Sequence, residues 1–167
     1  MKALILSADG FEDSELLVPY YRLLEAGYTV EVASGARGSI RGVHCYEVPV
    51  AHTFAEVDAT GYDVLVLPGG KAPAAIRNDR HAQSIARAFF DADKPVAAIC
   101  HGPQTLISAG LLRGRRVTCY RTVAQEMRDA GALYEDVEVV VDGNLVTSRH
   151  PADIPAFLRE MMRLLAR

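Results

Sequence analysis

Short apolar runs alternate along this chain with longer segments whose apolar residues recur at helical spacing. The runs over 2–7, 28–33, 63–67 and 95–99 are too short for helices and predict buried strands. Helices are predicted over 14–26, 73–90 and 103–112. Gly27 ends the first of these, and we expect Pro19 to kink that helix or to mark its real start. This alternation predicts an α/β fold with a mostly parallel sheet covered by helices on both faces.

The rest of the chain continues the pattern less regularly. We expect a further strand over 116–119, a helix over 122–130, and a hairpin over 137–146 that turns at Asp142-Gly143. Apolar residues between Ile154 and Leu165 recur at helical spacing, which predicts a C-terminal helix packed on the core. Because no repeat, low-complexity tract or linker divides the sequence, we expect a single domain over 1–167.

Composition and charge narrow the classes of function. The chain has 167 residues, of which 50% are hydrophobic, so it can bury a core without disulfide bonds. Its 18 basic and 21 acidic residues are spread along the chain, and this pattern favours neither nucleic acid nor a membrane surface as partner. The first apolar run is too short for a signal peptide or a membrane span. We expect a cytoplasmic protein whose partner is a small molecule or another copy of itself.

The cysteines and histidines do not suggest a structural metal site. Three cysteines without a CxxC pair argue against a disulfide framework and against structural zinc, so we expect reduced thiols. Cys45 and Cys119 lie in or beside strand-like runs, and we expect both to be small buried apolar residues. None of the histidines outside 95–103 has the spacing of metal ligands. We therefore expect no metal and no cofactor.

One segment carries a candidate nucleophile. The run 95–99 is typical of a buried strand, Pro103 suits the first turn of a helix, and Cys100 falls on the sharp turn between them. Such an elbow lifts a side chain clear of the backbone and leaves free amide donors beside it. A helix N-terminus also lowers the pKa of a thiol toward the reactive thiolate. We therefore expect Cys100 to lie on an exposed turn and to be the reactive thiol.

Two further loops should reach the same edge of the predicted sheet. Ligands of open α/β sheets bind outside the carboxyl ends of the strands. The first strand ends shortly before Glu12, and the third runs into Gly69 and Gly70. A glycine backbone permits close approach to a ligand, and the amides of Gly70 and His101 would form an oxyanion hole beside Cys100.

Each of these residues also has a simpler interpretation. Glu12 could favour the N-terminus of a helix through its charge alone. His101 could be an exposed turn residue whose side chain diverges from that of Cys100, because consecutive side chains often point apart. Gly69 and Gly70 also suit an ordinary turn. The residues alone leave these alternatives open.

Several segments together resemble the PfpI branch of the ThiJ/PfpI superfamily over nearly the whole chain. They are 8–21 with its Phe-Glu-Asp, 65–70 with Pro-Gly-Gly, 98–103 with Cys-His-Gly-Pro, 140–144, and the later Ser148-Arg149. The resemblance implies a flavodoxin-like three-layer sandwich related to class I glutamine amidotransferases. It also implies a nucleophile at Cys100, a partner at His101, an acidic hydrogen-bond partner at Glu12, and a homo-oligomer, either a dimer or a hexamer. Family activities include intracellular protease or amidase, deglycase and glyoxalase, besides stress-protective chaperone roles.

Two positions depart from the family pattern. In PfpI-type proteases, a residue just after the Pro-Gly-Gly loop supplies a carboxylate to the histidine across a subunit interface, and the matching position here is Ala74. Without that carboxylate nothing obvious orients His101 or stabilises its charged form, which disfavours peptide hydrolysis. Arg121 stands where relatives often have proline, beside Tyr120, which we expect to line the substrate pocket.

These residues favour a cofactor-free cysteine hydrolase or lyase that acts on reactive carbonyls or glycated amines. A carboxylate and a thiolate in one desolvated site share a proton, so we expect a Cys100 thiolate beside a protonated Glu12. Amidase or protease activity is the weaker enzymatic variant. The alternative from another class is a redox-sensing stress protein or chaperone, in which Cys100 is oxidised to a sulfinate that Glu12 caps.

Overall fold

In the computed structural model, which describes residues 1–166, a seven-stranded sheet runs through the centre of the molecule. In sheet order its strands are β10 (Val139–Asp142), β11 (Leu145–Ser148), β7 (Val96–Ile99), β6 (Val64–Leu67), β1 (Lys2–Leu6), β2 (Thr29–Ser34) and β5 (His52–Thr53). Neighbouring strands pair in parallel, except for the hairpin of β10 and β11. The sequence predicted this hairpin and the parallel core of the sheet.

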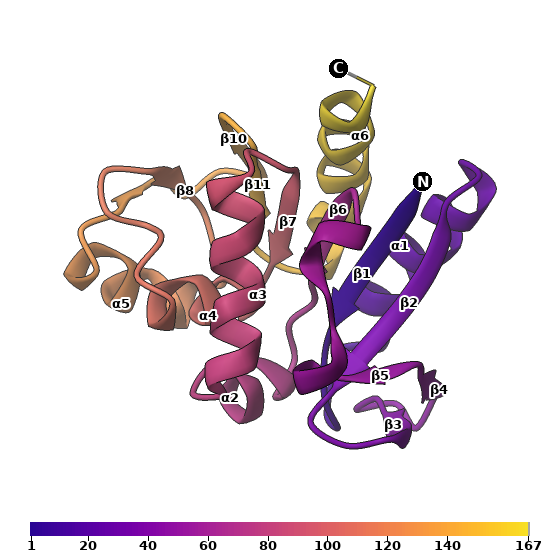
Figure 1. Ribbon diagram of the computed structural model, residues 1–167. Helices are drawn as coiled ribbons and strands as arrows, with labels where there is room; N and C mark the ends of the chain where they lie inside the picture. The colour runs from indigo at the N-terminus through magenta and orange to yellow at the C-terminus, as the bar shows by residue number, and fades with distance from the viewer. Residues whose placement is uncertain (167) are drawn as a thin grey trace.

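Helices cover both faces of the sheet (Figure 1). One face carries α2 (Ala72–Ile76), α3 (Arg80–Asp91), α4 (Pro103–Ser108) and α5 (Ala124–Asp129), and the other carries α1 (Asp13–Glu25) and α6 (Ile154–Leu165). This arrangement confirms the predicted three-layer α/β sandwich. Among the described helices, none combines the length and the apolar composition needed to cross a membrane.

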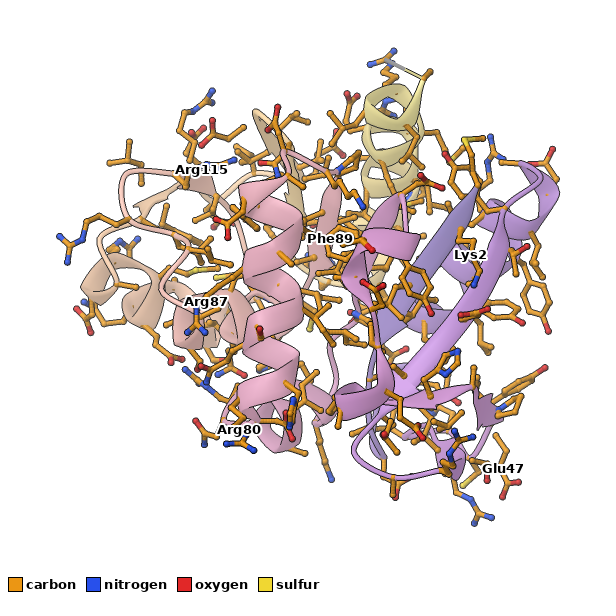
Figure 2. The ribbon with its side chains drawn as sticks, viewed as in Figure 1. Lys2, Glu47, Arg80, Arg87, Phe89 and Arg115 are labelled. Atoms are coloured by element: carbon orange, nitrogen blue, oxygen red, sulfur yellow. The ribbon has the colours of Figure 1, made fainter. Side chains whose placement is uncertain are left out.

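Side chains of the central strands alternate between two hydrophobic cores. In β1, Leu4 and Leu6 join the core beneath α3, whereas Ala3 and Ile5 join the core beneath α1 and α6. On the first face, Phe89 of α3 is fully buried (Figure 2). Because both faces of the strands are covered, each central strand is a continuous apolar run, and this made the strands predictable from the sequence.

The helices differ from the sequence predictions in two places. Helix α1 begins at Asp13 and continues through Pro19, so this proline does not mark its start. The helix expected over 73–90 is divided into α2 and α3. The division occurs at Asp79, whose carboxylate accepts hydrogen bonds from the backbone N–H groups of His81 and Ala82 and so caps the start of α3.

Several short elements were not predicted. They are strand β5, the antiparallel pair β3 (Gly38–Arg41) and β4 (Glu47–Val50), strand β9 (Leu133–Tyr134) paired with β8 (Arg116–Val117), and 3-10 helices over Phe54–Glu56, Ala59–Gly61 and Pro151–Asp153. The helix predicted over 122–130 is present as a 3-10 turn, Arg121–Val123, followed by α5. The turn between β3 and β4 exposes Cys45 at a φ of 68°, so the expectation that this cysteine is buried was wrong. Cys119 is buried, as expected. Most of β3 and β4 faces solvent, which explains why no apolar period revealed them.

Gly102, directly after the turn that follows β7, packs against the backbone at the end of β6. A Cβ atom here would lie 2.1 Å from the carbonyl oxygen of Leu67 and 2.9 Å from that of Ile99. Neither backbone oxygen can move without disturbing a central strand. The connection between β7 and α4 therefore requires glycine at this position.

We predict that Gly102→Ala lowers the free energy of unfolding by about 2–4 kcal/mol, because the turn must shift away from β6. Urea unfolding followed by circular dichroism measures this loss. Gly35→Ala is the matched control, since a Cβ atom at Gly35 would meet nothing within 4 Å. Equal losses in the two variants would contradict the packing argument.

Candidate active site

Cys100 lies on the turn from β7 into α4. Its φ of 62° is in the left-handed region, which is uncommon for a residue other than glycine. Neighbouring segments hold this conformation: the Cys100 N–H donates to the carbonyl oxygen of Ser148 at 3.0 Å, and the Tyr120 N–H donates to that of Cys100 at 3.0 Å. The strand-to-helix elbow is therefore present. Cys100 is only 7% exposed, however, so the expectation of an exposed turn was wrong.

The loop of Gly69 and Gly70 passes directly beside this elbow. A Cβ atom at Gly69 would lie 2.7 Å from the Cβ of Cys100, and one at Gly70, where φ is 78°, would lie 2.4 Å from the backbone nitrogen of Glu12. The close approach explains both glycines better than an ordinary turn does. It also brings the backbone N–H groups of Gly70 and His101 within hydrogen-bond reach of the Cys100 sulfur.

The carboxyl group next to the thiol belongs to Glu15, in the first turn of α1. Glu15 is fully buried, and its Oε2 accepts a hydrogen bond from the Gly69 N–H at 2.8 Å. The other oxygen, Oε1, is buried and has no hydrogen-bond partner among the described residues. The Glu15 side chain as a whole interacts with the Cys100 thiol. Burial raises the pKa of Glu15 to about 7.

Glu12, the acidic residue that we expected beside the thiol, instead caps helix α1. Its Oε1 accepts hydrogen bonds from the hydroxyl group of Ser14 at 2.8 Å and from the Ser14 N–H at 3.4 Å, and its Oε2 lies 3.6 Å from Nε2 of His44. The helix-start interpretation of Glu12 therefore describes its contacts, although the residue also lines the pocket. The expected pairing with Cys100 is corrected to Glu15.

The sequence did contain a signal for Glu15. This residue shares the buried face of α1 with Leu16, Pro19 and Leu23. An ionisable side chain at the apolar spacing of a helix must be buried, and a buried acid near a predicted nucleophile is a candidate site residue. Glu12 lies one helical turn earlier, where the backbone is still extended and its side chain can reach back to the helix N-terminus.

Cys100 and Glu15 form a coupled pair of titrating groups. Burial raises the pKa of the Cys100 thiol, the charge of Glu15 raises it further, and the N–H groups of Gly70 and His101 act in the opposite direction. Two negative charges so close together in a desolvated site are unfavourable. The pair therefore keeps at least one proton at neutral pH, and this proton belongs to both groups.

His101 is positioned by the Cys100 sulfur, a hydroxyl group and an aromatic ring. Its Nδ1 lies 3.2 Å from the Cys100 sulfur, its Nε2 lies 3.4 Å from the Thr122 hydroxyl group, and its ring packs against Tyr120 with 5.0 Å between centroids. The side chain therefore does not diverge from the thiol. The histidine–carboxylate pairs among residues 1–166 involve other histidines. Burial lowers the pKa of His101, which favours the neutral imidazole.

These side chains open onto a pocket of about 480 Å³. It is lined by Glu12, Glu15, Gly70, Lys71, Ala74, Cys100, His101, Gln104, Tyr120 and Pro151. Ala74 contributes only a methyl group to this wall. The structure thus brings together the expected residues Cys100, His101, Gly70 and Tyr120, and it adds Glu15 to them.

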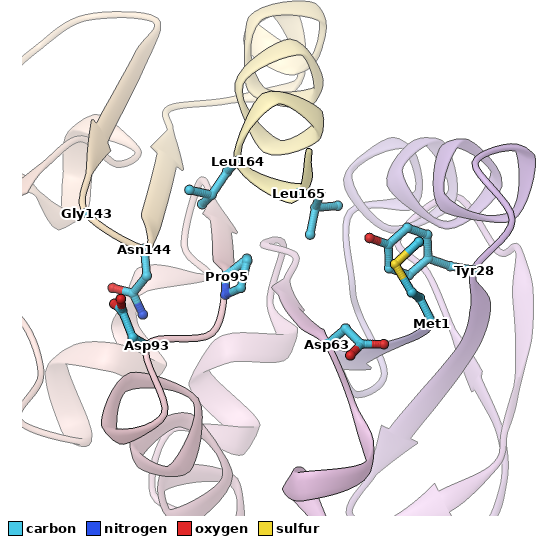
Figure 3. A pocket seen from close by; sticks show the side chains of 9 residues that line it. All are labelled: Met1, Tyr28, Asp63, Asp93, Pro95, Gly143, Asn144, Leu164 and Leu165. Atoms are coloured by element: carbon cyan, nitrogen blue, oxygen red, sulfur yellow. The ribbon is translucent and has the colours of Figure 1, made fainter. Parts of the chain in front are cut away.

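A second pocket, of about 470 Å³, lies at the opposite end of the central strands from Cys100 (Figure 3). Its lining includes Met1, Asp63 and Pro95, which directly precede β1, β6 and β7. Leu164 and Leu165 of α6 lie on one side of it, and Asp63 and Asp93 lie on the other. Its lining includes neither a cysteine nor a histidine. Within residues 1–166, no three potential metal ligands are grouped to hold an ion. The pocket at Cys100 is therefore the candidate active site.

The chain is similar over nearly its whole length to several known proteins. Over 165 residues, covering 99% of both chains, the protein is 53% identical to Deglycase PfpI of Pyrococcus furiosus. It is 43% identical over 165 residues, 98% of each chain, to the putative cysteine protease YraA of Bacillus subtilis. A solved two-domain protein from Anabaena variabilis, with DJ-1/ThiJ/PfpI-like and ferritin-like domains, matches 99% of this chain with a TM-score of 0.96 and 35% identity. This chain spans 48% of that protein.

The resemblance to PfpI-type proteins is thereby confirmed. A family model described as the DJ-1/PfpI family matches residues 1–164, which include every residue of the candidate site. The chain belongs to the DJ-1/PfpI family.

Proposed function

We propose that this protein is a deglycase, a cofactor-free cysteine enzyme that releases amines from their adducts with reactive carbonyls such as methylglyoxal. The observation that carries the proposal is the buried Glu15 carboxyl group beside the Cys100 thiol. The backbone N–H groups of Gly70 and His101 also face the Cys100 sulfur. Relatives named deglycases support it. A relative named general stress protein 18 supports a stress-protective role, and the unpaired cysteines suit the cytoplasmic location expected from the sequence.

The proposed reaction starts from a Cys100 thiolate with the shared proton on Glu15. The sulfur attacks the carbonyl carbon of the adduct, and the carbonyl oxygen gains negative charge in front of the Gly70 and His101 N–H groups. Glu15 then gives its proton to this oxygen. Neutral His101 takes the proton of the neighbouring hemiaminal hydroxyl group and passes it to the amine nitrogen as the carbon–nitrogen bond breaks. The amine leaves, and the carbonyl fragment remains as a hemithioacetal on Cys100 until its release.

The surroundings of His101 favour this chemistry over peptide hydrolysis. Expelling the amine of a peptide requires a protonated histidine, which a carboxylate usually stabilises. The Thr122 hydroxyl group can orient the ring of His101 but carries no charge, and Ala74 offers no polar atom. An adduct of a dicarbonyl is more electrophilic and needs less help. Oxidation to a sulfinate depends on exposure of the thiol, so the burial of Cys100 gives the redox alternative no specific support.

We further propose that a second copy of this chain covers an apolar surface formed by Val18, Tyr21, Leu24, Val43 and Tyr46. Each of these side chains is at least 40% exposed, and the hydroxyl groups of Tyr21 and Tyr46 lie 3.2 Å apart. Exposed apolar patches of this kind mark protein interfaces. The surface adjoins the active-site pocket, since Glu12 contacts His44 in the same turn as Val43 and Tyr46.

We predict that Glu15→Gln slows amine release by about 100-fold, because the variant loses the proton that Glu15 donates. The assay measures free amine released from a methylglyoxal-treated lysine derivative. Glu12→Gln is the matched control and should stay within a few-fold of the wild type, whereas Cys100→Ser should be inactive. A wild-type protein without turnover would refute the deglycase proposal. Equal activity of Glu15→Gln and wild type would refute the role of Glu15.

Ala74→Glu should raise amidase activity on a fluorogenic peptide, because a carboxylate near His101 would hold the imidazole and stabilise its charged form. Methylglyoxal-adduct turnover should stay within a few-fold of that of the wild type. The proposal would fail if the wild type already hydrolysed the peptide well through Cys100 and if Ala74→Glu left that activity unchanged.

Light scattering at micromolar concentration should report an oligomer, and Tyr21→Glu should shift it toward the monomer by placing a charge in the apolar surface. Leu133→Glu provides the control, since Leu133 is 58% exposed on β9, outside that surface. A monomeric wild type, or dissociation by Leu133→Glu alone, would contradict the proposed interface.

A further inference from the structure

A smaller pocket, of about 350 Å³, adjoins the candidate active site. Its lining consists of Tyr120, Arg121, Asp136, Arg149 and His150, and we name it the arginine pocket. Tyr120 lines both pockets, and His150 directly precedes Pro151 of the active-site wall. The backbone of Tyr120 bonds to that of Cys100 at 3.0 Å, so a single residue separates the arginine pocket from the nucleophile.

The two arginines of the arginine pocket differ in their partners. Arg149 is fully engaged, because it contacts the Asp136 carboxylate at 2.9 Å and holds both oxygens of the buried Asp153 at 2.8 and 3.2 Å. Arg121 makes no ion pair with any carboxylate among residues 1–166. Arg149 therefore has two carboxylate partners, whereas Arg121 has none. Arg121 is the guanidinium group of this pocket that remains available to an anion.

The backbone fixes where Arg121 stands. It begins the 3-10 helix Arg121–Val123, which closes through a hydrogen bond from the Val123 N–H to the Tyr120 carbonyl oxygen at 2.8 Å. The same short helix carries Thr122, whose hydroxyl group lies 3.4 Å from the His101 ring. One short helix therefore carries Arg121, which lines the arginine pocket, and Thr122, which contacts His101.

From this geometry, and resting on the proposed function, we propose that the arginine pocket binds an anionic group of the substrate whose reacting carbonyl lies at Cys100. The ligand group is a carboxylate or a phosphate, because the planar guanidinium fork of arginine matches both. Glu12 and the negative charge that Cys100 and Glu15 share disfavour an anion next to them in the active-site pocket. The anionic end of the substrate therefore binds at Arg121. This residue sets specificity for adducts of negatively charged amines, thiols or nucleotides.

The first test does not require deglycase activity. Cys100 is alkylated with iodoacetate, which is anionic, and with iodoacetamide, which is neutral, and peptide mapping gives the ratio of the two rates. Arg121→Gln should lower this ratio by about threefold to tenfold, the effect expected for removing one nearby charge, and Arg121→Lys should keep most of it. Exposed Cys45 in the same sample is the internal reference.

Two further variants make this test specific. Arg113→Gln removes an exposed arginine that lies outside both pockets and should leave the ratio at Cys100 unchanged. Lys71→Gln removes the lysine that lines the active-site pocket and should lower the ratio less than Arg121→Gln does. An unchanged ratio in Arg121→Gln, or a preference that depends entirely on Lys71, would overturn the proposal.

The second test identifies the source of the anionic group. Methylglyoxal adducts of N-acetylcysteine and its amide differ by a carboxylate, and those of guanosine monophosphate and guanosine differ by a phosphate. Arg121→Gln should raise KM by about threefold to tenfold for the charged member of at least one pair. The variant should leave kcat, and KM for both neutral adducts, nearly unchanged. Equal KM changes for charged and neutral adducts would overturn the proposal. If no adduct were turned over, the deglycase proposal would fail, while the alkylation ratio would still decide whether Arg121 attracts anions to Cys100.

Discussion

The active site depends on one buried interaction, the contact between the Glu15 carboxyl group and the Cys100 thiol. Burial makes a negative charge on either group unfavourable, and negative charges on both groups at once are more unfavourable still. The pair therefore retains a proton. Burial and the charge of Glu15 raise the pKa of the Cys100 thiol, and the backbone N–H groups around the sulfur act against them by stabilising the ionised sulfur. The site thus holds a nucleophile and a proton donor next to each other. No metal ion is needed for this arrangement of charge.

The fold is organised to bring these two groups together. Glu15 comes from the first turn of α1, after β1, and Cys100 comes from the end of β7, two strands away in the sheet. The Gly69 N–H joins them by donating to Glu15, and a side chain at Gly69 would collide with both partners. The left-handed backbone at Cys100 is held by β11 and by Tyr120. The segments that follow three neighbouring parallel strands, β1, β6 and β7, therefore surround the proton that Glu15 and Cys100 share.

The sequence predicted the parts of this structure that depend on local patterns. Strands buried on both faces produced continuous apolar runs, and the segment from Pro95 to Pro103 identified the elbow with Cys100. The choice between Glu12 and Glu15 depended on helix phase near an N-terminus, where a cap and a buried side chain are only one turn apart. The turn at Cys45 is exposed, so its residues show no apolar periodicity from which the turn could have been predicted. The neighbours of His101 come from a distant segment, so no sequence spacing could reveal Thr122.

The central claim is most directly tested by following one proton with two probes. Thiolate absorbance reports Cys100, and infrared absorption of the carboxyl group reports Glu15, both measured against pH in the wild type, in Cys100→Ser and in Glu15→Gln. The account predicts that the thiolate appears as the first proton leaves the wild-type pair while the Glu15 carboxyl signal persists, and that each variant shifts the titration of the remaining partner. Independent titrations, with the carboxyl signal lost near its ordinary pKa of about 4.3 and unaffected by Cys100→Ser, would contradict it.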